Sequence, residues 1–371
     1  MKEGGHIVAL DGLRGIAALI VVLFHLFETF STGPENQVLN HGYLAVEFFF
    51  LLSGYILSLA YDERKMSFRA FMRRRVKRLH PMIIMGCTLG LLVLGLQKCN
   101  AFPLLESLPI TRVLLVYFLG CFLIPTLPSL DIRGWTEMYP LNSPQWTMLY
   151  EYIANVIYAL FLRKAGKIAL ICMSIFAALL TIDLTFNFDV FSIYGERAAL
   201  SYTVIGGWTS TWPDIYIAFV RLSYPFVIGM LLRRSQIRIR CKKGPGIAAF
   251  LLCLALCSPR LFPSVQFVNG LYETFCILFL LPLIILLANA DSIAERNVPI
   301  CKYIGELSFP LYLTHFPFVY LQVAMCERYP GHDWLISIGC FCLIILFAVL
   351  FGWINRRISS IFSKSSIEKI G

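Results

Sequence analysis

Charged residues are scarce in this chain: lysine, arginine, aspartate and glutamate together make up 15% of its 371 residues. Hydrophobic residues make up 58% of the chain, and the mean hydropathy is +0.72. A soluble domain of this length needs a far more polar surface. The composition therefore excludes that class and predicts a polytopic membrane protein.

The sequence also lacks the cysteine spacing of a metal site. Its 12 cysteines are scattered, mostly inside apolar runs, and the two that lie nearest in sequence are Cys340 and Cys342. Pairs of cysteines separated by two residues, which structural zinc sites use, are absent. We therefore expect reduced, buried thiols that pack as small apolar groups, and no metal.

Neither a signal peptide nor a soluble catalytic domain is expected. Arg14 interrupts the first apolar segment, and no small-residue cleavage site follows that segment. The longest outer loop that we predict, 187–215, is short. Any chemistry must therefore take place within the membrane bundle.

Basic residues exceed acidic residues by 32 to 22, which gives a formal net charge of +10. In a membrane protein such a surplus reports topology and contact with anionic lipid headgroups rather than with nucleic acid. The linker 63–80 is especially rich in arginine and lysine. The positive-inside rule places this linker in the cytoplasm, and with it the N-terminus, two spans earlier.

Apolar segments recur along the whole chain, and the number that cross the membrane depends on the segment 111–128, which prolines bracket. If that segment crosses fully, the basic clusters from Arg163 to Lys302 fall outside; if it is re-entrant or interfacial, every cluster falls inside. We therefore predict an all-α polytopic membrane protein with about ten transmembrane helices, one re-entrant or interfacial segment and both termini cytoplasmic. The segments cover residues 7–28, 43–62, 80–97, 111–128, 144–162, 167–186, 216–233, 246–262, 271–289, 303–325 and 334–353. The predicted membrane domain would span 1–354, and 355–371 would form a short basic cytoplasmic tail.

The first apolar segment contains Asp11, Arg14 and His25. On an α-helix Arg14 and His25 differ by only about 20° in heading and lie about 16 Å apart along the axis. Ionisable groups at membrane depth are costly, so a line of them on one face predicts a functional site. The alternative is that Arg14 snorkels to the interface and His25 meets water at the far end.

Three further apolar segments carry ionisable groups. Glu47 is expected at about the depth of His25, where a carboxylate would hold the tautomer of an imidazole; the alternative is an interfacial glutamate that faces water. Glu151 and His315 lie inside two later segments. Each could simply satisfy an interhelical hydrogen bond, but together these residues favour a lined cavity.

A basic run precedes the third segment. Arg69, Arg73 and Lys77 follow a spacing of four residues, and so do Arg74 and Arg78, so a helix would present a basic face at the membrane surface. Guanidinium groups bind phosphate oxygens bidentately, which suits a multiply phosphorylated ligand. The alternative is a simple topological anchor.

These motifs, in this order, resemble the acyltransferase-3 family of integral membrane acyltransferases, and they are spread over nearly the whole chain. The matching stretches are Leu10–Ala18 leading to Phe24-His25, Phe48–Tyr55, Phe71–Pro81, Ser143–Trp146 with Glu151, and Leu311–His315. The resemblance implies transfer of an acyl group, commonly acetyl, from an acyl-CoA to an acceptor that is often a cell-surface sugar.

The family's R-x10-H motif maps onto Arg14 and His25, which implies that both are essential to transfer. Its R-x-x-R-type motif maps onto the run that contains Arg75 and Arg78, which implies an acyl-CoA site on the cytoplasmic side. The family usually has aspartate where this chain has Glu47, so whether Glu47 makes the same contact stays open.

We therefore expect a membrane-embedded O-acyltransferase that uses acetyl-CoA or another acyl-CoA as co-substrate. His25 would remove the proton of an acceptor hydroxyl, and Arg14 would guide the donor or stabilise negative charge. Glu151, Glu47 and His315 are further candidates for orienting the imidazole or the acceptor. The CoA phosphates would be held by Arg73, Arg74, Arg75 and Arg78.

The expected partners are acyl-CoA, a carbohydrate or other hydroxyl-bearing acceptor, and membrane lipid, with no nucleic acid. The expected location is the bacterial inner (plasma) membrane, with the acceptor, such as a cell-surface polysaccharide, on its outer side. The alternative function is a secondary transporter or flippase that uses the same polar residues, although the two halves show no internal repeat. Acceptor identity, acyl chain length, O- or N-acylation, an acyl-enzyme intermediate and oligomeric state stay open.

Overall fold

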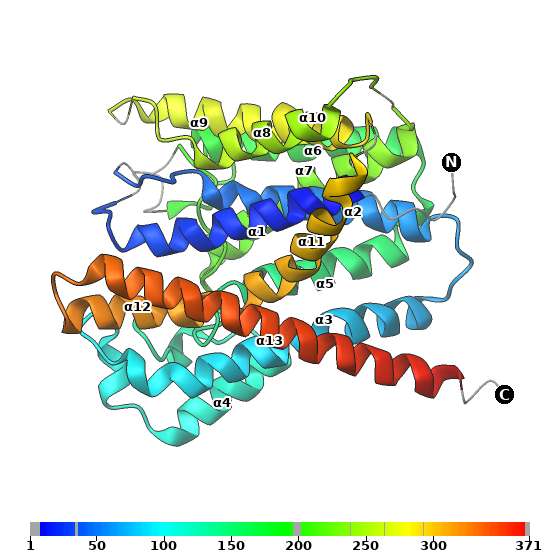
Figure 1. Ribbon diagram of the computed structural model, residues 1–371. Coiled ribbons are helices and arrows are strands. Elements are labelled where there is room, and N and C mark those ends of the chain that lie inside the picture. Colours follow the sequence, from blue (N-terminus) through cyan, green and yellow to red (C-terminus); the bar gives the residue numbers. More distant parts are fainter. Residues whose placement is uncertain are drawn as a thin grey trace. The chain divides into compact units, whose positions relative to one another are not determined.

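The computed structural model describes residues 8–33, 36–195, 202–237, 239–262, 264–291 and 293–367, with side chains as far as residue 358 (Figure 1). These residues form α-helices, short 3-10 helices and one π-helical turn, and contain no β-strand. The predicted all-helical class is confirmed. The α-helices are α1 (Val8–Glu28), α2 (Ala45–Tyr61), α3 (Phe68–Val93), α4 (Ile110–Cys121), α5 (Gln145–Leu160), α6 (Lys167–Phe186), α7 (Trp212–Ser235), α8 (Gly244–Cys257), α9 (Gln266–Phe275), α10 (Leu281–Ala288), α11 (Val298–Thr314), α12 (Phe316–Arg328) and α13 (Asp333–Ile367).

Seven helical segments of the described chain are long and apolar enough to cross a membrane. Two more apolar helices are shorter, α4 and α8. The 12 residues of α4 rise about 18 Å, well short of the hydrocarbon core of about 30 Å. Multi-pass membrane architecture is therefore supported, while the count of about ten crossings and the cytoplasmic termini stay predictions. The seven segments are Val8–Glu28, Gly42–Tyr61, Phe68–Gln97, Lys167–Phe186, Trp212–Ser235, Gln266–Ala288 and Asp333–Ile358.

Two predicted segments differ from the helices that form. The predicted segment 80–97 becomes part of a longer helix, α3, which begins at Phe68 and so includes the basic run. Ser67 caps the start of this helix by accepting a hydrogen bond from the N–H of Ala70 at 3.3 Å. The predicted span 303–325 is interrupted at His315, where α11 ends and α12 begins. Pro317 lies at the first turn of α12, and its missing N–H and rigid ring favour a break at that point.

The chain divides into two compact units. Unit 1 comprises Met1–Lys65 and Leu149–Ser308, and unit 2 comprises Met66–Met148 and Phe309–Gly371.

In unit 1, α2, α5 and α7 finish at the same end. Arg234 donates to both carboxylate oxygens of Asp62, at 2.7 and 3.1 Å, and to the carbonyls of Leu162 and Ala165. The loops that leave this end carry the basic segments 163–167 and 233–243. We call it the basic end of unit 1, and it is where the sequence predicts that positive charge gathers.

Unit 1 has a second end, where α1 finishes and α2 begins, which we call the His25 end. There the Tyr43 hydroxyl, the Thr203 hydroxyl and the N–H of Val204 all donate to the buried carboxylate of Glu273. These bonds fasten the loop before α7 and the second half of α9 to the turn that leads into α2.

Glycines let α2 and α7 approach each other closely. A Cβ added to Gly54 would overlap the carbonyl oxygen of Phe226, and one added to Gly229 would overlap the carbonyl oxygen of Leu51. Small residues at membrane helix interfaces allow this backbone contact. The close packing fixes the register of α2 against α7, and with it the position of the charged groups that the two helices share.

Candidate functional site

Arg14 lies on the first half of α1 and is held by α11. Its Nε donates to the hydroxyl of Ser308 at 2.8 Å, and its Nη2 donates to the carbonyl of Gly305 at 2.6 Å. The same Nη2 lies 3.4 Å from Asp11 on α1. The side chain is 28% exposed. The guanidinium is therefore oriented by fixed partners while part of it stays accessible.

His25 lies on the last turn of α1, at the His25 end of unit 1. Its Nδ1 is 2.7 Å from the carboxylate of Glu28, one turn further along the same helix. The ring is 21% exposed, and the ring of Phe24 meets it edge to face. The sequence prediction that Arg14 and His25 occupy well-separated levels of one helix holds, since α1 is continuous between them.

Glu47 has a different partner from the one the sequence suggested. Its two carboxylate oxygens accept hydrogen bonds from Nε and Nη2 of Arg221, at 2.5 and 3.2 Å, and both side chains are almost fully buried. Arg221 also donates to the carbonyls of Gly206 and Tyr43. The pair joins α2, α7 and the loop before α7, and whether Glu47 also acts in catalysis stays a prediction.

Glu151 faces α2 from the first half of α5, where it accepts a hydrogen bond from Ser53 at 2.8 Å. Asn155 lies one turn further on and is fully buried, with no hydrogen-bond partner among the described residues for either amide atom. Further along α5, Tyr158 donates to Asp62 on α2. This face of α5 thus carries polar groups from the interior of unit 1 to its basic end.

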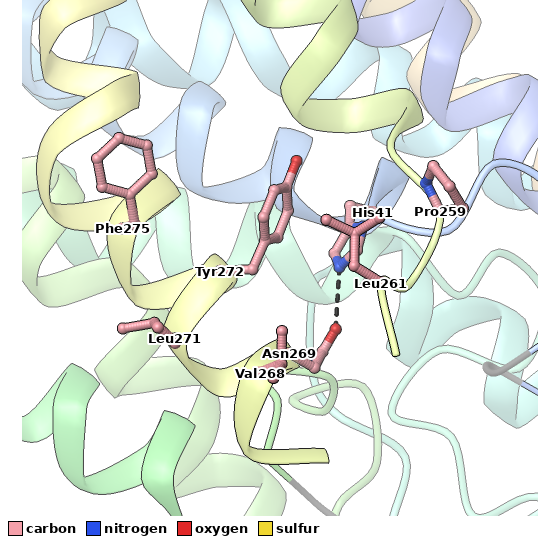
Figure 2. Close-up of a pocket in the computed structure, with 8 residues that line it drawn as sticks. All are labelled: His41, Pro259, Leu261, Val268, Asn269, Leu271, Tyr272 and Phe275. Atoms are coloured by element: carbon pink, nitrogen blue, oxygen red, sulfur yellow. Dashed lines mark hydrogen bonds between the residues drawn. The ribbon is translucent and has the colours of Figure 1, made fainter. Parts of the chain in front are cut away.

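A pocket lies at the His25 end of unit 1, between α9 and the loop after α8 (Figure 2). Its walls are mostly apolar. His41, one of the lining residues, contacts the carbonyl of Ser258 at 2.7 Å and the amide oxygen of Asn269 at 3.0 Å. Since both ring nitrogens are engaged with protein atoms, His41 is held as a structural residue. The pocket is lined by His41, Pro259, Leu261, Val268, Asn269, Leu271, Tyr272 and Phe275.

The basic run of unit 2 forms the first turns of α3. Arg73, Arg74 and Arg78 are exposed, whereas Arg75 is only 6% exposed and lies on the buried side of the helix between Phe71 and Leu79. The sequence predicted phosphate binding by four arginines. Three of them present an exposed basic face, and the fourth belongs to the packed side of α3.

His315, also in unit 2, is fully buried at the break between α11 and α12. Its Nδ1 lies 2.9 Å from the carbonyl of Tyr312 and 3.3 Å from that of Leu311. Because a carbonyl only accepts, Nδ1 carries the proton in this arrangement. The ring thereby satisfies backbone groups of the turn that the break leaves open.

A buried cation in unit 2, Arg133, was not foreseen. It lies 3.5 Å from the ring centre of Tyr320 and donates to the carbonyl of Pro140 and the amide oxygen of Gln97. The neighbouring Glu137 accepts from the Tyr320 hydroxyl at 2.6 Å. Burial raises the pKa of Glu137 and lowers the pKa of Arg133. These bonds order the loop that leads into Ser143–Trp146.

Comparison with known proteins decides the family. The model of the acyltransferase domain that defines the acyltransferase-3 family matches residues 7–354. The chain belongs to this family. It is thus an acyltransferase, and the resemblance drawn from its motifs is confirmed.

Two bacterial relatives are similar to this chain, and one of them is named as an acyltransferase. The chain is 27% identical over 331 residues to "Acyltransferase MdmB" of Streptomyces mycarofaciens. The aligned region covers 83% of this chain and 78% of that protein. It is 30% identical over 164 residues to "Protein 2 in picA locus" of Rhizobium radiobacter, covering 41% of this chain and 80% of that protein.

A third relative is "Putative O-acetyltransferase" of Staphylococcus aureus, 36% identical over 117 residues, which make up 30% of this chain and 17% of that protein. No solved structure matches the chain. Among the described residues, no group of three or more histidine, cysteine, aspartate or glutamate side chains is placed to hold a metal ion.

The sequence-based interpretation missed three partners of its candidate residues. Glu28 follows His25 by three positions, a spacing that places the two side chains together on any helix, so it could have been found. Arg221, a lone arginine within an apolar segment, signalled a buried carboxylate partner. That Ser308 contacts Arg14 follows from tertiary packing and has no local signal.

Proposed function

We propose that this acyltransferase moves an acetyl group from acetyl-CoA to a hydroxyl of a sugar or glycan-type acceptor. The donor binds on the cytoplasmic side of the bacterial inner membrane, and the acceptor lies on the outer side. One observation supports this sidedness most: within unit 1, His25 lies at the end opposite the one where the basic loops gather. Positively charged loops favour the cytoplasm, which directs His25 outward.

His25 acts as the general base. An acceptor hydroxyl is a weak nucleophile at neutral pH, so the imidazole removes its proton as the oxygen attacks the thioester carbonyl. The bond between carbonyl carbon and sulfur then breaks, and the proton passes from the imidazole to the departing CoA thiolate. The products are the acetyl ester and free CoA, and the histidine returns to its neutral form.

The exposed arginines of α3 bind the phosphates of CoA. Arg73, Arg74 and Arg78 present guanidinium groups on the accessible side of the helix, and guanidinium forks match phosphate oxygens. Arg75 supports this face from the packed side of α3 rather than by direct contact with CoA.

Arg14 guides the donor or stabilises negative charge on it. The guanidinium is oriented by Ser308 and Gly305 and is still 28% exposed, which leaves it able to meet an anionic group. Preorganised donors of this kind are effective because they do not have to reorient during the reaction. Glu151 and His315 remain further candidates for orienting the acceptor.

The test uses native membranes that contain the protein and its natural acceptor. Acetyl-CoA with a radiolabelled acetyl group is added, and both release of the CoA thiol and labelling of membrane material are measured. We expect His25→Ala and Arg14→Ala to lose both signals, the former by at least about 100-fold. His332→Ala, which changes an exposed histidine near the start of α13, is the matched control.

Wild-type rates in folded, membrane-inserted His25→Ala protein would overturn this assignment. Movement of a labelled solute across the membrane without any release of CoA thiol would instead favour a transporter or flippase.

A further inference from the structure

The last turn of α1 carries a carboxylate beside the candidate base. Oε2 of Glu28 lies 2.7 Å from Nδ1 of His25, and the two residues are three positions apart on the helix. The imidazole is 21% exposed and the carboxylate 45% exposed. The contact therefore lies at the edge of unit 1, where an acceptor that approaches from outside can reach it.

Three other carboxylates at this end of unit 1, those of Glu47, Glu273 and Asp214, have partners of their own. Both oxygens of Glu47 accept from Arg221. Both oxygens of Glu273 also accept hydrogen bonds, from Tyr43 and Thr203 on one side and from the N–H of Val204 on the other.

Asp214, near the start of α7, accepts the N–H of Thr209. The carboxylate of Glu28, by contrast, lies against His25.

We infer that Glu28 is the positioning residue that sets the tautomer of His25. The inference rests on the proposed function, in which His25 is the general base. An ionised carboxylate accepts hydrogen bonds only, so the proton of the neutral imidazole resides on Nδ1. The basic lone pair is then on Nε2, because the tautomer follows from the hydrogen bond that the other nitrogen makes.

This arrangement assigns every proton of the transfer step. Nε2 takes the hydroxyl proton while Nδ1–H stays bonded to Glu28, and the carboxylate stabilises the imidazolium that forms. When the bond from carbonyl carbon to sulfur breaks, Nε2 returns that proton to the thiolate. Glu28 remains ionised throughout and contacts neither substrate nor donor.

The experiment compares Glu28→Ala and Glu28→Gln with wild-type protein in native membranes. Glu28→Ala is expected to lower kcat by about 10- to 100-fold, less than loss of the base itself, with little change in the KM for acetyl-CoA. Glu28→Gln keeps an oxygen that accepts from Nδ1, so it should recover a large part of that loss. Glu295→Ala, an exposed glutamate beyond α10, is the matched control.

A spectroscopic measurement separates positioning from general stability. Nitrogen NMR of protein with labelled histidine, with the His25 signals assigned by their loss in His25→Ala, reports which ring nitrogen carries the proton. We expect protonated Nδ1 in wild type and in Glu28→Gln, and loss of that preference in Glu28→Ala.

If His25→Ala is inactive while Glu28→Ala keeps the wild-type kcat and tautomer, the inference about Glu28 fails and the proposed function stands. If His25→Ala itself is active, both fail. If Glu28→Ala fails to fold while Glu28→Gln folds and is fully active, the tautomer of His25 in Glu28→Gln decides the inference: a proton on Nδ1 would support it, and a proton on Nε2 would overturn it.

Discussion

Glu47 and Arg221 form a bidentate ion pair in which both side chains are no more than 2% exposed. One lies on α2 and the other on α7, 174 positions apart in the sequence. A buried charge without its partner is strongly destabilising, so neither residue is independent of the other. The pair joins α2 to α7.

The ion pair predicts how substitutions of Glu47 behave. Glu47→Leu leaves Arg221 buried and uncompensated, so we expect a loss of about 3–5 kcal/mol of stability and little folded protein. Glu47→Gln still offers Arg221 an acceptor and should fold. Thermal unfolding in detergent, followed by size-exclusion chromatography, measures both. A folded Glu47→Gln protein with near wild-type acetyl transfer would indicate that Glu47 has a structural role. A large loss of kcat in the folded variant would indicate that Glu47 acts in catalysis.

The exposed and buried arginines of α3 should respond differently to substitution. Changing Arg73, Arg74 and Arg78 to glutamine removes phosphate contacts and should raise the KM for acetyl-CoA several-fold while folding is retained. The same variant should show no such change with acetyl-pantetheine, which lacks the nucleotide phosphates. The measurement is the ratio of kcat/KM for the two donors.

Arg75→Gln is the matched variant for that series, because it removes the same charge from the packed side of the helix. We expect lower thermal stability and an unchanged ratio of the two donors. A rise in KM specific to acetyl-CoA in Arg75→Gln alone would reassign the phosphate contact to that residue.

Arg14 and Ser308 allow the contribution of one hydrogen bond to be measured. Ser308→Ala removes a single partner of the guanidinium, so we expect a loss in kcat/KM of no more than about tenfold, equivalent to roughly 1.5 kcal/mol. Arg14→Ala removes the charge itself and should be far more severe. Equal effects of the two substitutions would show that Arg14 acts only by holding α1 against α11.

Most helices and several candidate site residues could be predicted from the sequence, because both follow local rules. Runs such as 167–186 coincide with α6, since an apolar stretch in a membrane must satisfy its backbone internally as a helix. Arg14 and His25 were found because their spacing on one helix is visible without any tertiary knowledge.

What could not be predicted depends on contacts between distant segments. The partner of Glu47 is Arg221, and nothing local to either residue specifies the other. The burial of Arg75 among exposed arginines likewise follows from how α3 packs. The break at His315 was signalled by Pro310 and Pro317, but prolines also occur inside continuous membrane helices, as Pro225 does in α7.

Topology is testable at two open glycines of unit 1. A Cβ added to Gly33, beyond the end of α1, or to Gly166, before α6, meets no atom within 4 Å, so short epitopes inserted there should be tolerated. The cells are first stripped of their outer membrane and wall, with the inner membrane left intact. We expect an added antibody to bind the Gly33 epitope on these cells, and to bind the Gly166 epitope only after the inner membrane is permeabilised. Access to both epitopes from one side would contradict the arrangement of unit 1.

The central claim is that an acetyl group from a donor bound at the cytoplasmic face is transferred to an acceptor hydroxyl that His25 deprotonates at the opposite face. Membrane vesicles of known orientation test it most directly, because acetyl-CoA added outside does not cross the membrane. The account predicts release of CoA thiol and protected, acetyl-labelled product in inside-out vesicles, little of either in right-side-out vesicles, and loss of both with His25→Ala. Equal release in the two orientations, or persistence of transfer in folded His25→Ala protein, would contradict it.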